Sequence, residues 1–107
     1  MKKVNRGQAK QQPSFDLGQV VATPGALEAL GRNQMTGVEL LARHCRGDWG
    51  ELCAEDKKAN ESALKTGARL LSSYHLPDGE KLWIITDAEI DEQHHRYATT
   101  LLLPEDY

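Results

Sequence analysis

The stretch that decides the fold is Arg69–Thr86, which reads RLLSSYHLPDGEKLWIIT. Residues 81–86 alternate with a period of two, so Leu82 and Ile84 face one side of a strand and Trp83 faces the other. Before them comes a second strand-like run, and the PDG between the runs sets the backbone for a tight turn. The stretch therefore predicts two adjacent strands over 69–76 and 81–86.

A third apolar run, Tyr97–Leu103, ends at Pro104 and completes the pattern. Proline cannot donate a backbone hydrogen bond, so it is a natural end for a strand. Residues 87–96 lie between the second and third runs and are expected to form a loop. Apolar side chains occur on both sides of the second strand, which indicates that both faces of the sheet are at least partly covered.

Three helix-start signals precede these strands, each a capping side chain followed by proline or by a glutamate three residues on: Thr23-Pro24, Thr36–Glu39 and Asp48–Glu51. A glycine follows each segment and can end the helix in a left-handed conformation, at Gly31, Gly47 and Gly67. The last segment is polar from Glu55 to Lys65, so we expect it to rest on a narrow apolar seam. A break near Ala54 would divide it into two helices.

Residues 17–22 contain Leu17, Val20 and Val21 and could form a short strand or an extended lead-in to the first helix. The expected fold is α+β. Short N-terminal helices pack on one face of a C-terminal three-stranded antiparallel meander, with an extra short strand near 17–22 as the open alternative.

Charge divides the 107-residue chain into two parts. The first fourteen residues carry +4 and no acid, whereas residues 15–107 carry −7. With almost no apolar content, residues 1–14 cannot offset their ordering entropy, which predicts a disordered basic tail before a single α+β domain over 15–107. The tail could touch nucleic acid through its four basic side chains, Lys2, Lys3, Arg6 and Lys10.

Neither a signal peptide nor a membrane-spanning apolar run is visible in the sequence. We therefore expect a cytoplasmic protein with no membrane association, in which Cys45 and Cys53 stay reduced.

Several motifs together resemble a family of small proteobacterial proteins usually called plasmid-related protein. They span residues 17–107 and include VATPGAL (21–27), LLARH (40–44), GDWGELC (47–53), WIIT (83–86) and TTLLLPEDY (99–107). The resemblance implies cargo of plasmids and integrative elements, sometimes labelled a type I restriction-modification subunit. The chain lacks the glycine-rich loop and the Asn-Pro-Pro-aromatic motif of a methyltransferase, and the family supplies no catalytic residues to carry over.

Candidate sites for chemistry are weak. His44, Cys45 and Cys53 offer three metal ligands at most, where zinc prefers four. In the 88–97 loop, which looks longer than in the family, His94 and His95 lie beside Asp91 and Glu92 and are interpreted as solvated. The acidic residues Asp48, Glu51, Glu55 and Asp56 are explained by capping and by an exposed helix surface. We therefore assign no catalytic, metal or cofactor site.

Aromatic residues are the better candidates, because exposed tryptophan and tyrosine often anchor a partner. Trp49, Trp83 and Tyr107 are possible partner contacts, with burial in the core as the competing interpretation of both tryptophans and a tied-down chain end that of Tyr107. The leading hypothesis is a non-enzymatic accessory protein of a mobile genetic element that binds an unknown protein or a second copy of itself. The alternatives are nucleic-acid binding through the basic tail and a small nuclease-like enzyme.

Overall fold

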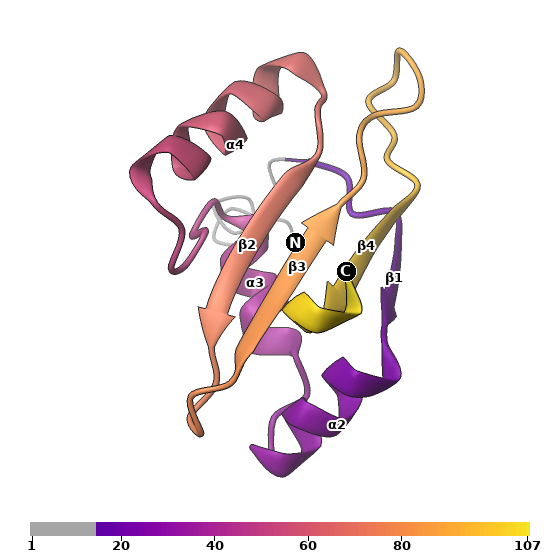
Figure 1. Cartoon of the computed structure of the whole chain (residues 1–107). Coiled ribbons are helices and arrows are strands. Elements are labelled where there is room, and N and C mark those ends of the chain that lie inside the picture. The colour runs from indigo at the N-terminus through magenta and orange to yellow at the C-terminus, as the bar shows by residue number, and fades with distance from the viewer. Residues whose placement is uncertain (1–14) are drawn as a thin grey trace, which may run out of the picture.

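The computed structural model describes residues 15–107, which form an α+β fold around one four-stranded sheet (Figure 1). The strands lie in the order β1-β4-β3-β2. Their bounds are β1 Gln19–Ala22, β2 Leu70–His75, β3 Lys81–Thr86 and β4 Ala98–Leu102. The helices are α2 Pro24–Arg32, α3 Val38–Cys45 and α4 Ala54–Thr66, and a short 3₁₀ turn, η1, covers Pro104–Asp106.

The meander is present as predicted, but the sheet is larger and mixed. Antiparallel pairing joins β2 to β3 and β3 to β4. The prediction of a three-stranded antiparallel sheet is wrong because β1 adds a fourth strand parallel to β4, with Gln19 opposite Ala98. The open alternative near 17–22 is thus a strand. Its partner lies almost eighty residues away, so no local pattern could have revealed the pairing.

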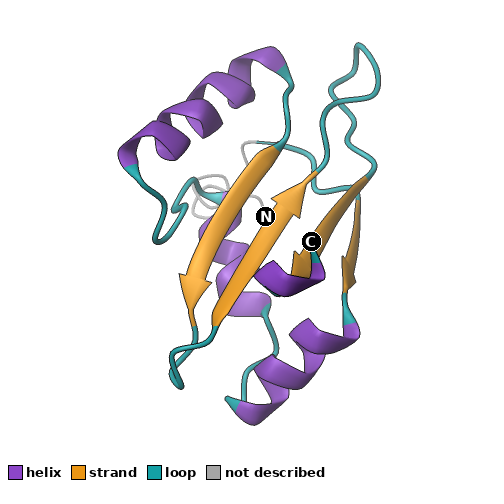
Figure 2. Cartoon of the chain, viewed as in Figure 1, coloured by secondary structure: helices purple, strands orange, loops and turns teal. Residues whose placement is uncertain are grey.

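The expected arrangement of the helices on one face is correct for α2 and α3 only. Their buried residues, among them Ala29, Leu30 and Leu40, pack with Tyr74 and Ile84 of the sheet in one core cluster. Helix α4 instead lies beside the outer edge of β2, which is the edge that faces away from β3 (Figure 1). The turn η1 lies on the face of the sheet opposite to α2 and α3 (Figures 1 and 2). We call the face covered by α2 and α3 the inner face and the other the outer face.

Two helix boundaries differ from the sequence interpretation. Helix α2 runs through Gly31 to Arg32, and its C-cap is Asn33, whose side-chain Nδ2 donates to the Ala29 carbonyl at 2.8 Å. The expected capping box at Thr36 is also absent. Gly37, with φ of 90°, is the N-cap of α3, and the Thr36 hydroxyl makes only a 3.4 Å contact with the Val38 amide. The left-handed backbone at Gly37 gives α3 its direction in place of a side-chain cap.

The predicted helix start at Asp48 is wrong. Residues 49–51 run beside the outer edge of β2, where the Ser73 amide donates to the Trp49 carbonyl (3.1 Å) and the Glu51 amide donates to the Ser73 carbonyl (2.6 Å). Helix α4 begins later, after Cys53. Edge strands carry unpaired backbone groups, and pairing with one of them outweighs the local signal for a helix.

Asn60 closes the same edge from α4. Its side chain is bonded to both backbone groups of Leu71, donating to the carbonyl at 2.6 Å and accepting from the amide at 3.1 Å. Asn60 is only 3% exposed, so water cannot replace it.

We therefore expect Asn60→Ala to lower the free energy of unfolding by roughly 2–3 kcal/mol, because both backbone groups of Leu71 lose their partner. Denaturant unfolding monitored by tryptophan fluorescence measures the change. Ser62→Ala, at an exposed position of the same helix, is the matched control and should unfold like the wild type. Equal midpoints for Asn60→Ala and wild type would contradict this role.

Candidate partner-binding surface

The outer face of the sheet is defined by strand alternation. Ser73, Trp83 and Leu102 lie opposite one another in register, and the next row is Leu71, Ile85 and Thr100. These side chains point away from the inner core because alternate residues of a strand face opposite sides. The outer face is therefore largely apolar along its centre, with Trp83 only partly buried.

The C-terminal turn η1 folds the end of the chain back over this face. Asp106 holds the turn, because its Oδ2 accepts from the Leu103 amide at 3.0 Å and from the Thr23 hydroxyl at 2.6 Å. Thr23 also caps α2 by accepting from the Ala26 amide. The hydrogen bond from Thr23, with that from the Leu103 amide, lowers the pKa of Asp106 below its ordinary value. The chain end is therefore tied down, and Tyr107 has a defined position.

Tyr107 is the centre of an aromatic and cationic cluster. Its ring meets Trp83 edge-to-face, with the ring centroids 5.9 Å apart and an interplanar angle of 67°. The guanidinium carbon of Arg69 lies 5.7 Å from the same ring centroid, and Arg69 Nη1 donates to the Tyr107 hydroxyl at 2.5 Å. Tyr107 remains 69% exposed. We call Arg69, Trp83 and Tyr107 the outer-face cluster.

The structure brings together two of the three aromatic residues selected from the sequence. Trp83 and Tyr107 share the outer-face cluster, but Trp49 is 4% exposed and belongs to the core with Phe15, and its Nε1 donates to Glu61 at 3.0 Å. The competing interpretation, burial in the core, therefore describes Trp49, which presents no exposed ring to a partner. Arg69 was missed. Its position just before β2, on the same alternation as Leu71, was the signal that could have found it.

The basic side chains proposed for nucleic-acid contact, Lys2, Lys3, Arg6 and Lys10, lie outside the described residues. So does the whole segment 1–14 that the sequence predicts to be disordered.

His44, considered from the sequence as a metal ligand, lies at the centre of a buried polar chain. It is fully buried, with Nδ1 2.5 Å from the Ser72 hydroxyl and Nε2 2.9 Å from the Thr86 hydroxyl. The chain continues from Thr86 to the Thr99 hydroxyl at 2.8 Å, which donates to the Leu17 carbonyl at 2.7 Å. Burial lowers the pKa of His44 to about 4, so the ring is neutral at pH 7.

The carbonyl at the end of this chain determines which group donates in each of its hydrogen bonds. The Leu17 carbonyl can only accept, so Thr99 donates to it, and Thr86 in turn donates to Thr99. Thr86 must then accept from Nε2–H of His44, which leaves Nδ1 to accept from Ser72. Each contact in the chain thus has one donor and one acceptor. Through this chain His44 links α3 to β2, β3 and β4, which is a structural role.

The two cysteines do not join His44 in a site. Cys45 is buried, which raises the pKa of its thiol, and Cys53 is exposed before α4. Among residues 15–107 no group of three or more His, Cys, Asp or Glu side chains is placed to hold a metal ion.

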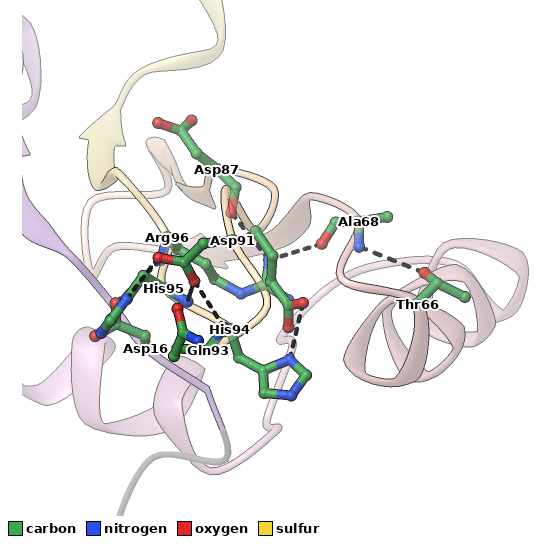
Figure 3. Close-up of polar contacts among 10 residues, drawn as sticks. Asp16, Thr66, Ala68, Asp87, Asp91, Gln93, His94, His95 and Arg96 are labelled. Atoms are coloured by element: carbon green, nitrogen blue, oxygen red, sulfur yellow. Dashed lines mark hydrogen bonds and ion pairs between the residues drawn. The ribbon is translucent and has the colours of Figure 1, made fainter.

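The loop 87–96 places its histidines beside carboxylates (Figure 3). His94 Nδ1 lies 3.0 Å from Glu89, and His95 Nδ1 lies 2.8 Å from Asp91. The Asp91 carboxylate raises the pKa of His95, and the hydrogen bonds from His95, the backbone bond first, lower the pKa of Asp91. Both contacts join residues of the same loop and so stabilise its conformation.

The buried side chain of Arg96 anchors this loop. Its side chain is 1% exposed, and Nη1 donates to the carbonyls of Ala68 (2.7 Å) and Asp87 (2.9 Å) (Figure 3). Nη2 lies 3.6 Å from Glu89. The loop is therefore built around a buried cation that ties it to the start of β2.

The acidic residues considered as a paired-carboxylate site have separate structural roles. Asp48 accepts from Arg43 at 2.7 Å, and this hydrogen bond lowers the pKa of Asp48. Glu51 contributes its backbone amide to the edge of β2. Glu55 and Asp56 lie exposed in the first turn of α4, where negative charge suits the helix dipole.

In the part of the chain that the structure describes, no helix has the length and apolar character needed to cross a bilayer. Comparison with protein-family models, curated proteins and solved structures gives no match to this chain.

Proposed function

We propose that this protein is a non-enzymatic accessory protein that binds another protein through its outer-face cluster. The observation that carries the proposal is the arrangement around Tyr107, whose ring meets Trp83 edge-to-face and lies under the Arg69 guanidinium. The turn η1 holds Tyr107 in place, and both Tyr107 and Arg69 are exposed to solvent. Tryptophan, tyrosine and arginine are the residue types most enriched among side chains that dominate binding energy. A pre-ordered cluster also loses little entropy when a partner binds.

Charge suggests the chemistry of the partner. Residues 15–107 are acidic overall, yet the outer face carries the exposed basic side chains of Arg69 and Lys81, with His75 opposite Lys81 in register. A segment with an apolar anchor flanked by carboxylates complements such a surface, and complementary charge favours specific encounter. The partner we propose is therefore a protein that presents an acidic segment with an aromatic or aliphatic side chain.

The proposal of a non-enzymatic role is supported by the internal use of the titratable groups. His44, Asp48, Asp91 and His95 are each engaged in hydrogen bonds that hold the fold. The proposed setting, cargo of a mobile genetic element, rests on the resemblance of residues 17–107 to the plasmid-related protein family.

The test is capture of a partner from cells of the natural host by the full chain and by single variants. We expect Tyr107→Ala and Arg69→Ala each to weaken retention of the same protein by roughly thirtyfold, about 2 kcal/mol, because both remove cluster contacts. Both positions are exposed, so thermal unfolding should change little.

Ile90→Ala is the matched control, because Ile90 is an apolar side chain 63% exposed on the loop 87–96, outside the cluster. It should retain the partner like the wild type. Retention that is equal in all three variants would remove the support for binding at the outer face.

A further inference from the structure

The two edges of the sheet differ in whether other residues bond to their backbone groups. The outer edge of β2 is closed by Trp49 and Glu51 at Ser73 and by Asn60 at Leu71. Natural proteins cover or charge such edges to prevent pairing with other chains. At the opposite edge, no described element lies beyond β1 (Figure 1).

The backbone of β1 has one bonded and one open side. The amides of Gln19 and Thr23 donate to the carbonyls of Tyr97 and Leu101, so residues 19, 21 and 23 face β4. In a parallel pair the alternate residues then direct their N–H and C=O groups outward, which leaves those of Val20 and Ala22 on the open side. No described residue bonds to them.

The side chains of β1 do nothing to block this edge. The strand reads Gln-Val-Val-Ala, with no charge and no proline, and Val20 and Val21 are 45% and 39% exposed. β-Branched residues favour extended pairing, and charge, proline and bulges are the usual devices against it. The edge is therefore suited to receive another strand.

We propose that two copies of this chain form a symmetric dimer by antiparallel pairing of their β1 strands. A two-fold axis at Val21 places Val20 of each copy opposite Ala22 of the other. These are the residues with open backbone groups, so each pair exchanges two hydrogen bonds and all the open groups are satisfied at once. The two Val21 residues then form the central non-hydrogen-bonded pair, in which side chains approach most closely.

Buried area favours a second copy over an isolated peptide. A four-residue edge is small, and specific interfaces bury about 1,200–2,000 Å² in total. A folded second copy adds surface on both sides of the strand. Helix α2 follows β1 directly and exposes 59% of Leu27, and Tyr97, whose carbonyl binds the Gln19 amide, is 70% exposed.

In the antiparallel arrangement the start of β1 in one copy lies beside its end in the other. Tyr97 of one copy is thereby brought level with the first turn of α2 of the other, near Leu27. Gly18, which lies between β1 and the preceding chain, offers no side chain to obstruct this contact. The dimer would join two sheets into one and would leave both outer-face clusters open.

Sedimentation of the full chain over a range of concentrations tests the dimer. We expect a monomer–dimer equilibrium whose dissociation constant rises roughly tenfold or more in Val20→Pro and in Val21→Lys. Val20→Pro removes one outward N–H that β4 does not use, and proline is tolerated on an open strand edge. Val38→Lys, at a valine 66% exposed on α3, is the matched control and should dimerise like the wild type.

A disulfide tests the register itself. Non-hydrogen-bonded antiparallel pairs have Cα atoms about 4.5 Å apart, within the range that a disulfide spans. In a Cys53→Ser background, which removes the exposed thiol, Val21→Cys should form a covalent dimer on mild oxidation. Val38→Cys in the same background should not.

A wild-type chain that sediments as a monomer at the highest soluble concentration would overturn the proposal. So would a dimer that survives both edge variants and gives no Val21→Cys crosslink. The outcome is separable from that of partner binding, because the edge variants leave Arg69, Trp83 and Tyr107 unchanged.

Discussion

His44→Ala should lower the free energy of unfolding by roughly 3–5 kcal/mol. The substitution leaves a cavity between α3 and the sheet. It also removes a hydrogen-bond partner from each of two buried hydroxyls, those of Ser72 and Thr86, of which Thr86 keeps its bond to Thr99. Denaturant unfolding measures the loss. A variant as stable as the wild type would contradict the central place given to the buried polar chain.

The same histidine should make stability depend on pH. Its folded pKa of about 4 lies below the unfolded value of 6.5, so the unfolded state binds the proton more readily between these values. The free energy of unfolding should therefore be unaffected by His44 above pH 6.5. It should fall by about 2 kcal/mol at pH 5 and by about 3 kcal/mol at pH 4.

His44→Asn provides the comparison for this titration, because asparagine can hydrogen-bond but does not ionise in this range. The stability of the wild type relative to His44→Asn should decline as the pH falls from 6.5 to 4. Parallel stability curves for the two proteins would mean that His44 does not titrate on unfolding as the structure requires.

In residues 49–51, the segment beside β2, Gly50→Ala should destabilise the protein more than any other addition of one methyl group. Gly50 has φ of 77°, a conformation that alanine adopts only with strain, and an added Cβ would collide with the Ser73 carbonyl and the Tyr74 ring. Relief of the collision would separate residues 49–51 from β2. We expect a loss of about 3 kcal/mol or more in the free energy of unfolding.

Gly31→Ala is the matched control for that substitution. Gly31 lies within α2, and a Cβ there would meet nothing within 4 Å. The variant should gain roughly 0.5–1 kcal/mol, because alanine loses less conformational freedom in a helix than glycine does. Thermal unfolding of both variants should therefore shift in opposite directions, and a downward shift for Gly31→Ala would contradict this reading of α2.

The strands were the part of the fold that the sequence predicted best. Alternation gave β3 its observed bounds, and β2 and β4 differ from the predicted runs by one residue at each end. Alternation is a local property of the chain, so it survives in isolation from the rest of the fold. The parallel partner of β1 is not local, and the sequence carries no comparable signal for it.

The helix starts show how a nonlocal interaction overrides a local signal. Asp48 and Glu51 have the spacing of a capping box, yet Asp48 binds Arg43 and the Glu51 amide pairs with Ser73. The signal at Thr23 was reliable because its hydroxyl does cap α2. Its second role, holding Asp106, depends on a contact across 83 residues that no capping rule contains.

Two of the three residues of the outer-face cluster could be selected from the sequence. Composition identified Trp83 and Tyr107 as candidate anchors, but their contact depends on η1, which Asp106 fixes by binding Thr23 and the Leu103 amide. The sequence could not separate Trp83 from Trp49, because burial is decided by tertiary packing. It also gave no reason to connect Arg69 with the end of the chain.

The most direct test of partner binding at the outer face is site-specific photocrosslinking in host cells. A photoreactive phenylalanine analogue in place of Tyr107 should give one defined crosslinked species with another protein, and Arg69→Ala in the same chain should abolish it. The same analogue in place of Ile90 should give no such species. Identical crosslinks from both positions, or none from position 107, would contradict the proposal that the outer-face cluster binds a protein partner.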